Sequence, residues 1–173
     1  MNAMVTIRPL RIHEIEAALR MKNQGWRQAY RGKLSEEILA GLDDSIEAQA
    51  EAWRMGFDAT GVVPFVAVDD DGAIVGIAGG GATRGDNPPT DVELFMIYVL
   101  EEHYGTGLGQ ALADAVIGNA AACVWVLDGN ERAIAFYRKL GFEPDGAKEQ
   151  LSERWNGLND IRMVRPAMSA PAH

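Results

Sequence analysis

Apolar and polar positions change their spacing several times along the chain, and each change predicts a different element. Residues 5–8 alternate as a half-buried strand does, and an apolar stripe at helical spacing follows from Ile12 to Tyr30. Ser35 is placed to cap a short helix, and residues 43–53 continue the helical spacing. The N-terminal third is therefore predicted as one strand followed by helices.

The middle of the chain has the pattern of strands. Val62–Val68 and Gly72–Ala78 meet across three aspartates, which predicts a β-hairpin with an Asp-Gly turn. Asp91–Val99 is apolar on both faces, as expected of a strand in the middle of a sheet. The glycines at 79–81 and the Asn-Pro-Pro at 87–89 are expected to bracket a flexible connection. The later elements are predicted as a helix after residue 107, a strand at 123–127, a helix at 130–140, and strands beginning at 142 and 161.

Length and composition narrow the class of protein. A chain of 173 residues is expected to form about one domain, and its 47% hydrophobic content is that of a globular protein. The single cysteine, Cys123, excludes an intramolecular disulfide. No leader-like N-terminal segment and no apolar run of ~18 residues is visible, which predicts a cytoplasmic protein that does not bind a membrane.

The charge balance bears on the partners. Sixteen Lys and Arg against 25 Asp and Glu give a net charge of −9. Such a surface repels nucleic acid, and no basic patch in the sequence offsets it, so no nucleic-acid partner is expected. The acidic balance would suit a cationic substrate, although solubility alone also explains it.

A glycine-rich segment, Tyr104–Gln110, follows the apolar strand and precedes a helix. The start of a helix leaves backbone N–H groups unpaired and carries partial positive charge. Glycines keep Cβ atoms away from those groups, so the segment is a good cradle for a pyrophosphate. A tight turn without any ligand is the alternative.

The spacing of the glycines bears on which phosphate ligand fits. A P-loop is excluded, because Gly32-Lys33 is followed by Leu34 rather than Ser or Thr. A dinucleotide fold requires Gly-x-Gly-x-x-Gly and an acidic residue about 20 positions later. Asp128 is near that distance, but the third glycine position holds Leu112 or Gln110. The glycine register therefore counts against a nucleotide-dependent oxidoreductase.

Three stretches resemble one family. Tyr98–Leu112 closely resembles the acetyl-CoA motif of the GNAT acyltransferases, and Trp125–Ala133 with Ala135–Phe142 matches at the proper distance. Trp26–Gly32 is similar to the substrate-side helix of many bacterial members. The resemblance implies a single GNAT-like α/β domain at 1–166 with a flexible tail at 167–173. Its mixed central sheet would be splayed at the middle strands and flanked by helices.

The resemblance also implies an activity, the transfer of the acetyl group of acetyl-CoA to a primary amine of a small molecule or peptide by direct attack in a ternary complex. Tyr104 stands where the family usually has Gln or Arg, so only its backbone N–H is expected to face the pyrophosphate. The residues that would bind acetyl-CoA are Tyr98, Val99, Tyr104, Gly105, Thr106, Gly107, Leu108, Gly109, Gln110, Asn130, Ala133 and Phe136. Asn130 is equally well explained as a helix cap.

Two residues are candidates for proton transfer. The departing thiol has a pKa of about 8.5 and a phenol one of about 10, so a protonated Tyr137 could serve as the general acid. The alternative is a tyrosine of the core. Glu93 resembles the strand glutamate that many members use as a base, directly or through water, and a partly desolvated carboxylate suits proton abstraction. A solvent-facing position or a structural ion pair would explain Glu93 equally well.

The sequence defines the binding site for the acceptor amine less well than the site for acetyl-CoA. Trp26, Tyr30 and Arg31 are expected to border the acceptor pocket, and Trp155–Asp160 to close its other side. Cys123 is expected to be buried rather than nucleophilic. The three histidines are scattered, so no metal is predicted. A non-catalytic acyl-CoA-binding sensor of the same fold is the alternative function, the acceptor amine stays open, and a homodimer is compatible with similar proteins.

Overall fold

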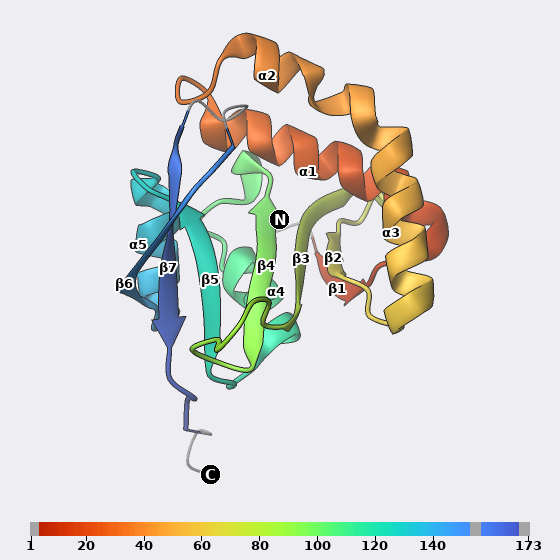
Figure 1. The fold of residues 1–173 in the computed structure, drawn as a ribbon. Helices are drawn as coiled ribbons and strands as arrows, with labels where there is room; N and C mark the ends of the chain where they lie inside the picture. Colours follow the sequence, from red (N-terminus) through yellow and green to blue (C-terminus); the bar gives the residue numbers. More distant parts are fainter. Residues whose placement is uncertain (1–3, 153–156, 170–173) are drawn as a thin grey trace. The chain divides into compact units, whose positions relative to one another are not determined.

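A computed structural model describes residues 4–152 and 157–169, which form both helices and strands (Figure 1). The α-helices are α1 (Ile15–Tyr30), α2 (Glu36–Ala40), α3 (Ile46–Thr60), α4 (Leu108–Ile117) and α5 (Glu131–Lys139). Three 3₁₀ turns are η1 (Ile12–Glu14), η2 (Gly41–Ser45) and η3 (Glu101–His103). The strands are β1 (Thr6–Pro9), β2 (Phe65–Val68), β3 (Ile74–Ala82), β4 (Val92–Val99), β5 (Ala122–Leu127), β6 (Glu143–Gln150) and β7 (Asn159–Arg165).

Among the described residues the strands follow the order β1-β2-β3-β4-β5-β7-β6, so β4 is the middle strand, as its two apolar faces predicted. Strand β5 runs parallel to β4, whereas the β1–β2, β2–β3, β5–β7 and β6–β7 pairs are antiparallel. The mixed α/β sheet of the expected fold class is therefore confirmed. The parallel register joins Val92–Leu94 to Ala122–Val124, and the expected splay beyond it stays a prediction.

The chain packs as two compact units. The first consists of Met1–Gly79 and Met96–Val116, and the second of Gly80–Phe95 and Ile117–His173. Both β3 and β4 continue from one unit into the other. Among the described residues, the helices are all too short or too polar to cross a membrane.

The first unit is built around the inner face of α1. Ile15, Ala18 and Leu19 recur at helical spacing and are fully buried, because they pack into the core with strands β2 and β3. The helix ends at Tyr30, before Gly32 with its positive φ of 77°. As predicted, Ser35 caps the next helix by accepting a hydrogen bond from the Ile38 N–H at 3.3 Å.

Polar contacts attach α1 to the segment that follows it in the first unit. The buried Asn23 side chain donates to the Leu42 carbonyl at 3.0 Å and to the Asp43 carboxylate at 2.8 Å. Arg27 forms an ion pair with the same carboxylate at 2.9 Å, and the Asn23 hydrogen bond lowers the pKa of Asp43. These contacts hold the C-terminal half of α1, which carries the predicted acceptor residues.

The glycines at 79–81 lie inside β3, which ends at Ala82, so the predicted connection begins later than expected. Side chains of β4 cover two of these glycines. A Cβ atom added at Gly79 would lie 3.1 Å from Met96 Cε, and one at Gly81 would lie 3.3 Å from Phe95 Cε2. The glycines thus keep the strand regular where a side chain would collide with the neighbouring strand.

In the second unit, β5 lies between β4 and β7, and Cys123 is fully buried on it, as expected. Strands β6 and β7 form an antiparallel pair with an irregularity between Pro144 and Lys148. The Met168 N–H donates to the Asn119 carbonyl at 2.8 Å, so the backbone just after β7 is held to the unit. Residues 170–173 of the predicted tail are outside the described part of the chain.

A buried arginine joins two helix ends in the second unit. The Arg165 side chain donates to the carbonyls of Gly118, Ala120 and Leu140, which follow α4 and α5. These carbonyls carry the negative ends of the two helix dipoles. They stabilise a guanidinium in a residue that is only 1% exposed.

We expect Arg165→Met to lower the free energy of unfolding by at least about 2 kcal/mol, because each buried carbonyl left without a donor costs roughly 1–3 kcal/mol. Arg162→Met is the matched control on the same strand, since it removes a partly exposed ion pair to Asp145 at 2.7 Å. This control should cost less than about 1 kcal/mol. Equal losses in urea denaturation of the two variants would show that the carbonyl contacts add no stability.

Candidate functional site

The glycine-rich segment forms an exposed loop between β4 and α4. Gly105 and Gly107 have φ values of 75° and 86°, a conformation that residues with a Cβ atom rarely adopt. A Cβ atom at either glycine would meet no other atom within 4 Å, so the backbone conformation rather than space requires glycine. Gly105, Thr106 and Gly107 are exposed, and Leu108 anchors the start of α4 in the core.

The loop presents backbone N–H groups at the start of α4. The Leu108 N–H donates to the Thr106 hydroxyl at 3.4 Å, and the Ala111 N–H donates to the Gly107 carbonyl at 3.0 Å. Gly109 and Gln110 precede Ala111 in the first turn, where N–H groups have no acceptor within a helix. The Thr106 hydroxyl donates to the His103 carbonyl at 2.7 Å and so holds the loop in place just before the helix begins. The residues present therefore fit a diphosphate anion.

Tyr104 contributes less to this loop than expected. Its backbone N–H donates to the Glu101 carbonyl at 3.1 Å and closes the η3 turn, so the expectation that this N–H faces a pyrophosphate was wrong. The preceding turn is held from α1, because the Glu101 N–H donates to the Gln28 side chain at 3.0 Å. Both contacts order the chain on its way into the loop.

The predicted acceptor residues lie at the C-terminal end of α1, also in the first unit. The Trp26 ring lies 4.6 Å from the Tyr30 ring and 6.2 Å from the Tyr98 ring, measured between centroids. Gly25 allows this approach, because a Cβ atom there would lie 3.3 Å from Tyr98 Cβ. Trp26 is thus brought together with Tyr98, one of the predicted acetyl-CoA residues. Arg31 follows the helix and is exposed.

Helix α5 of the second unit carries the other predicted residues. The Asn130 side chain accepts a hydrogen bond from the Ala133 N–H at 3.3 Å, so the capping role considered for Asn130 is confirmed. Tyr137 is buried, and its ring lies between Phe136 at 5.3 Å and Phe142 at 5.8 Å, both in edge-on geometry. This packing fixes the phenol ring, whichever role its hydroxyl has.

Glu93 is 2% exposed and forms an ion pair, one of the alternatives left open by the sequence. Its Oε1 accepts a hydrogen bond from Arg84 Nη2 at 2.6 Å, and its Oε2 accepts one from the Arg84 backbone N–H at 3.2 Å. The carboxylate raises the pKa of Arg84. A buried carboxylate needs such a partner, because desolvating an unpaired charge is costly.

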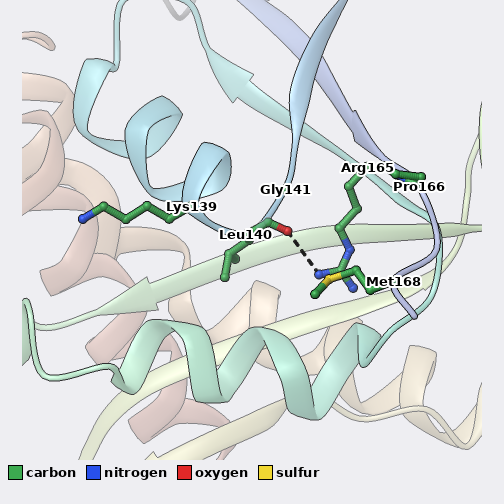
Figure 2. Close-up of a pocket in the computed structure, with 6 residues that line it drawn as sticks. All are labelled: Lys139, Leu140, Gly141, Arg165, Pro166 and Met168. Atoms are coloured by element: carbon green, nitrogen blue, oxygen red, sulfur yellow. Dashed lines mark hydrogen bonds between the residues drawn. The ribbon is translucent and has the colours of Figure 1, made fainter. Parts of the chain in front are cut away.

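A shallow pocket of about 200 Å³ lies elsewhere in the second unit (Figure 2). Its lining consists of Lys139, Leu140, Gly141, Arg165, Pro166 and Met168. None of the predicted site residues lines it, and Figure 2 shows the Arg165 guanidinium turned to the Leu140 carbonyl. This pocket therefore belongs to the structural contact at the helix ends. Residues 155–156 of the stretch expected to close the acceptor pocket lie outside the described residues.

The sequence reasoning missed two charged residues of the second unit, Arg84 and Asp160. Arg84 is in the loop between β3 and β4, where its pairing depends on the hairpin closed by the Thr83 N–H and the Asp91 carbonyl at 3.0 Å. Asp160 on β7 is opposite Glu149, and burial raises its pKa, with the Glu149 charge adding to the effect. A hairpin around residues 83–91 and pairing of the strands that begin at 142 and 161 were the signals that could have indicated these residues.

The profile of the acetyltransferase (GNAT) family matches residues 23–142, which is more than half of the chain and includes the loop, Glu93 and α5. The chain therefore belongs to the GNAT acetyltransferase family and is an N-acetyltransferase.

Individual relatives agree with this family. The uncharacterized N-acetyltransferase YuaI of Bacillus subtilis is 30% identical over 174 residues, which cover 96% of each chain. The L-methionine sulfoximine/L-methionine sulfone acetyltransferase of Pseudomonas paraeruginosa is 30% identical over 72% of this chain and 78% of its own length. The PaiA N-acetyltransferase of Thermoplasma acidophilum, solved with coenzyme A, has the same fold, with a TM-score of 0.68, 19% identity, and coverage of 94% of this chain and 99% of its own.

We expect Gly107→Ala to weaken coenzyme A binding at least about tenfold, because an alanine would shift the backbone out of the left-handed conformation. Holding alanine in that conformation costs roughly 1–2 kcal/mol. Gly61→Ala is the matched control, since Gly61 ends α3 with a φ of 68° and open space around its Cβ position. The control should lose similar stability and keep its affinity. Equal affinities in calorimetry for both variants would contradict a phosphate-binding loop.

Proposed function

We propose that this protein transfers the acetyl group of acetyl-CoA to the primary amine of a small molecule, within a complex of both substrates. The exposed loop at the start of α4 is the single observation that carries this proposal. Its left-handed glycines and first-turn N–H groups suit the diphosphate of coenzyme A. Membership of the acetyltransferase family supports acetyl-CoA as the donor.

Acetyl-CoA supplies an activated thioester, and the protein would position its diphosphate and manage the protons. The N–H groups of Gly109 and Gln110 offset the negative charge of the diphosphate. Tyr137 is proposed to donate its phenolic proton to the departing thiolate. Its packing between Phe136 and Phe142 would hold the hydroxyl at one position.

Glu93 remains the candidate base for the acceptor ammonium, directly or through a water molecule. Its ion pair with Arg84 competes with this role, because both carboxylate oxygens already accept hydrogen bonds. The two roles predict different kinetics, as described below.

Small amines that carry a carboxylate are the first acceptors to test. The Pseudomonas paraeruginosa relative is named for acetylation of L-methionine sulfoximine and L-methionine sulfone. We propose that this chain uses an acceptor of similar size, with Trp26, Tyr30 and Arg31 among the residues that contact it. A homodimer also remains a proposal. Release of the free thiol of coenzyme A, measured over a panel of amines and amino acids, is the direct test, and thermal stabilisation by coenzyme A but not by NAD is its companion.

We expect Tyr137→Phe to reduce kcat at least about 100-fold, in line with the usual contribution of a general acid. The change removes one oxygen and keeps the ring packing, so affinity for acetyl-CoA should stay the same. Phe142→Leu is the control, since it disturbs the packing around Tyr137 and keeps the phenol. The role of the phenol is lost if Tyr137→Phe retains full turnover in the thiol-release assay.

We expect Glu93→Gln to reduce kcat for every acceptor and to flatten the rise of the rate with pH, if Glu93 is the base. Glutamine keeps the shape and one acceptor oxygen of the side chain. The Arg84 side chain is 71% exposed, so water can solvate it once its partner is neutral. An unchanged pH–rate profile would exclude the base and leave the ion pair as the function of Glu93.

A further inference from the structure

Phe95 and Glu93, both in the second unit, hold the Arg84 side chain in place. The Phe95 ring covers Gly81, whose missing Cβ would lie 3.3 Å from Phe95 Cε2. The Arg84 guanidinium lies over the same ring, with 4.7 Å between its Cζ and the ring centroid. Glu93 binds both the side chain and the backbone N–H of Arg84. The guanidinium is therefore fixed by stacking and by a charge-assisted hydrogen bond.

This fixed arginine is nevertheless open to solvent. The Arg84 side chain is 71% exposed, whereas its partner Glu93 is 2% exposed. A guanidinium has five N–H donors, and the side-chain contact with Glu93 uses Nη2 alone. Long exposed side chains usually lose entropy when they bind a ligand, and here much of that cost is already met by the protein. Such a group is pre-organised to bind a planar anion.

We propose that Arg84 is a specificity-determining residue that binds the carboxylate of an amino-acid acceptor. The proposal rests on the acetyltransferase function above and narrows its acceptor class from amines in general to α-amino acids. In this role Glu93 is a positioning residue that orients Arg84.

The charges around Arg84 suit an acceptor with both signs. The Glu149 carboxylate acts electrostatically on Arg84 and on Asp160, which is opposite Glu149 across the β6–β7 pair. An amino acid brings a carboxylate for Arg84 and an ammonium that these acidic groups attract. A purely cationic amine would face Arg84 without a compensating group. The local arrangement thus favours a different acceptor from the cationic one suggested by the net charge of −9.

The test compares each α-amino acid of the acceptor panel with the amine that lacks its carboxylate. For Arg84→Gln we expect KM for the amino acids to rise about 10- to 100-fold, the loss typical of a hydrogen bond to a charged group. KM for the matched amines and for acetyl-CoA should stay within about twofold. Arg84→Lys keeps the charge without the planar fork and should recover part of the loss. Phe95→Leu should give an intermediate loss through the missing stacking surface.

Arg138→Gln is the control, because Arg138 is also an exposed arginine of the second unit, with a loose ion pair to Glu143 at 3.6 Å. Arg138→Gln should leave the preference for amino acids over their matched amines unchanged. Equal effects of Arg84→Gln on amino acids and amines would overturn the proposal, as would a wild-type preference for the amines. Calorimetry of the amino acids on the protein with bound coenzyme A gives a second readout, in which Arg84→Gln should weaken binding about 10- to 100-fold.

Failure of the proposed acetyltransferase function would give a different experimental result from failure of the role proposed for Arg84. If the wild-type protein neither binds coenzyme A nor releases thiol with any acceptor, the acetyltransferase proposal itself fails. If it acetylates amines and shows no discrimination between members of a matched pair, only the role of Arg84 fails.

Discussion

The middle strand β4 is the element on which the candidate site depends. A strand with neighbours on both sides has its backbone groups tied into the sheet, so its side chains are held at fixed positions. Its first half carries Glu93 and Phe95, and its second half carries Tyr98 and leads into the glycine loop. Register with β5 fixes Glu93 opposite the buried Cys123. The roles proposed for Glu93 require this part of the strand to be fixed.

Two kinds of electrostatic compensation support the functional proposals. At the start of α4, the N–H groups of the first helical turn provide partial positive charge, which suits a protein with an excess of acidic residues. At Glu93, a full negative charge is buried and its partner Arg84 is left exposed. The first arrangement suits the donor substrate, which is an anion. The second pairs a buried carboxylate with a fixed surface cation, which is the basis of the proposal that Arg84 selects the acceptor.

The sequence was sufficient to predict those features that depend on interactions between residues close together in the chain. The glycine loop, the Ser35 and Asn130 caps and the hairpin across Asp69–Asp71 all depend on residues within a few positions of each other. Predictions were less successful where a distant segment was involved. The glycines at 79–81 looked like the start of a connection, because the β4 side chains that cover two of them come later in the chain. The Tyr104 N–H was assigned to a ligand, because the η3 turn that occupies it is not visible in the glycine pattern.

The sequence alone determined the order of elements, the central place of β4, and a loop whose glycines suit a diphosphate, because these follow from periodicity and from the backbone freedom of glycine. Only the tertiary structure decided the state of Glu93. The sequence allows a base, a solvated residue or an ion pair, and the choice depends on which charge the fold brings near it. The closure of the β3–β4 hairpin brings Arg84 within 2.6 Å, and burial of the carboxylate makes that contact necessary.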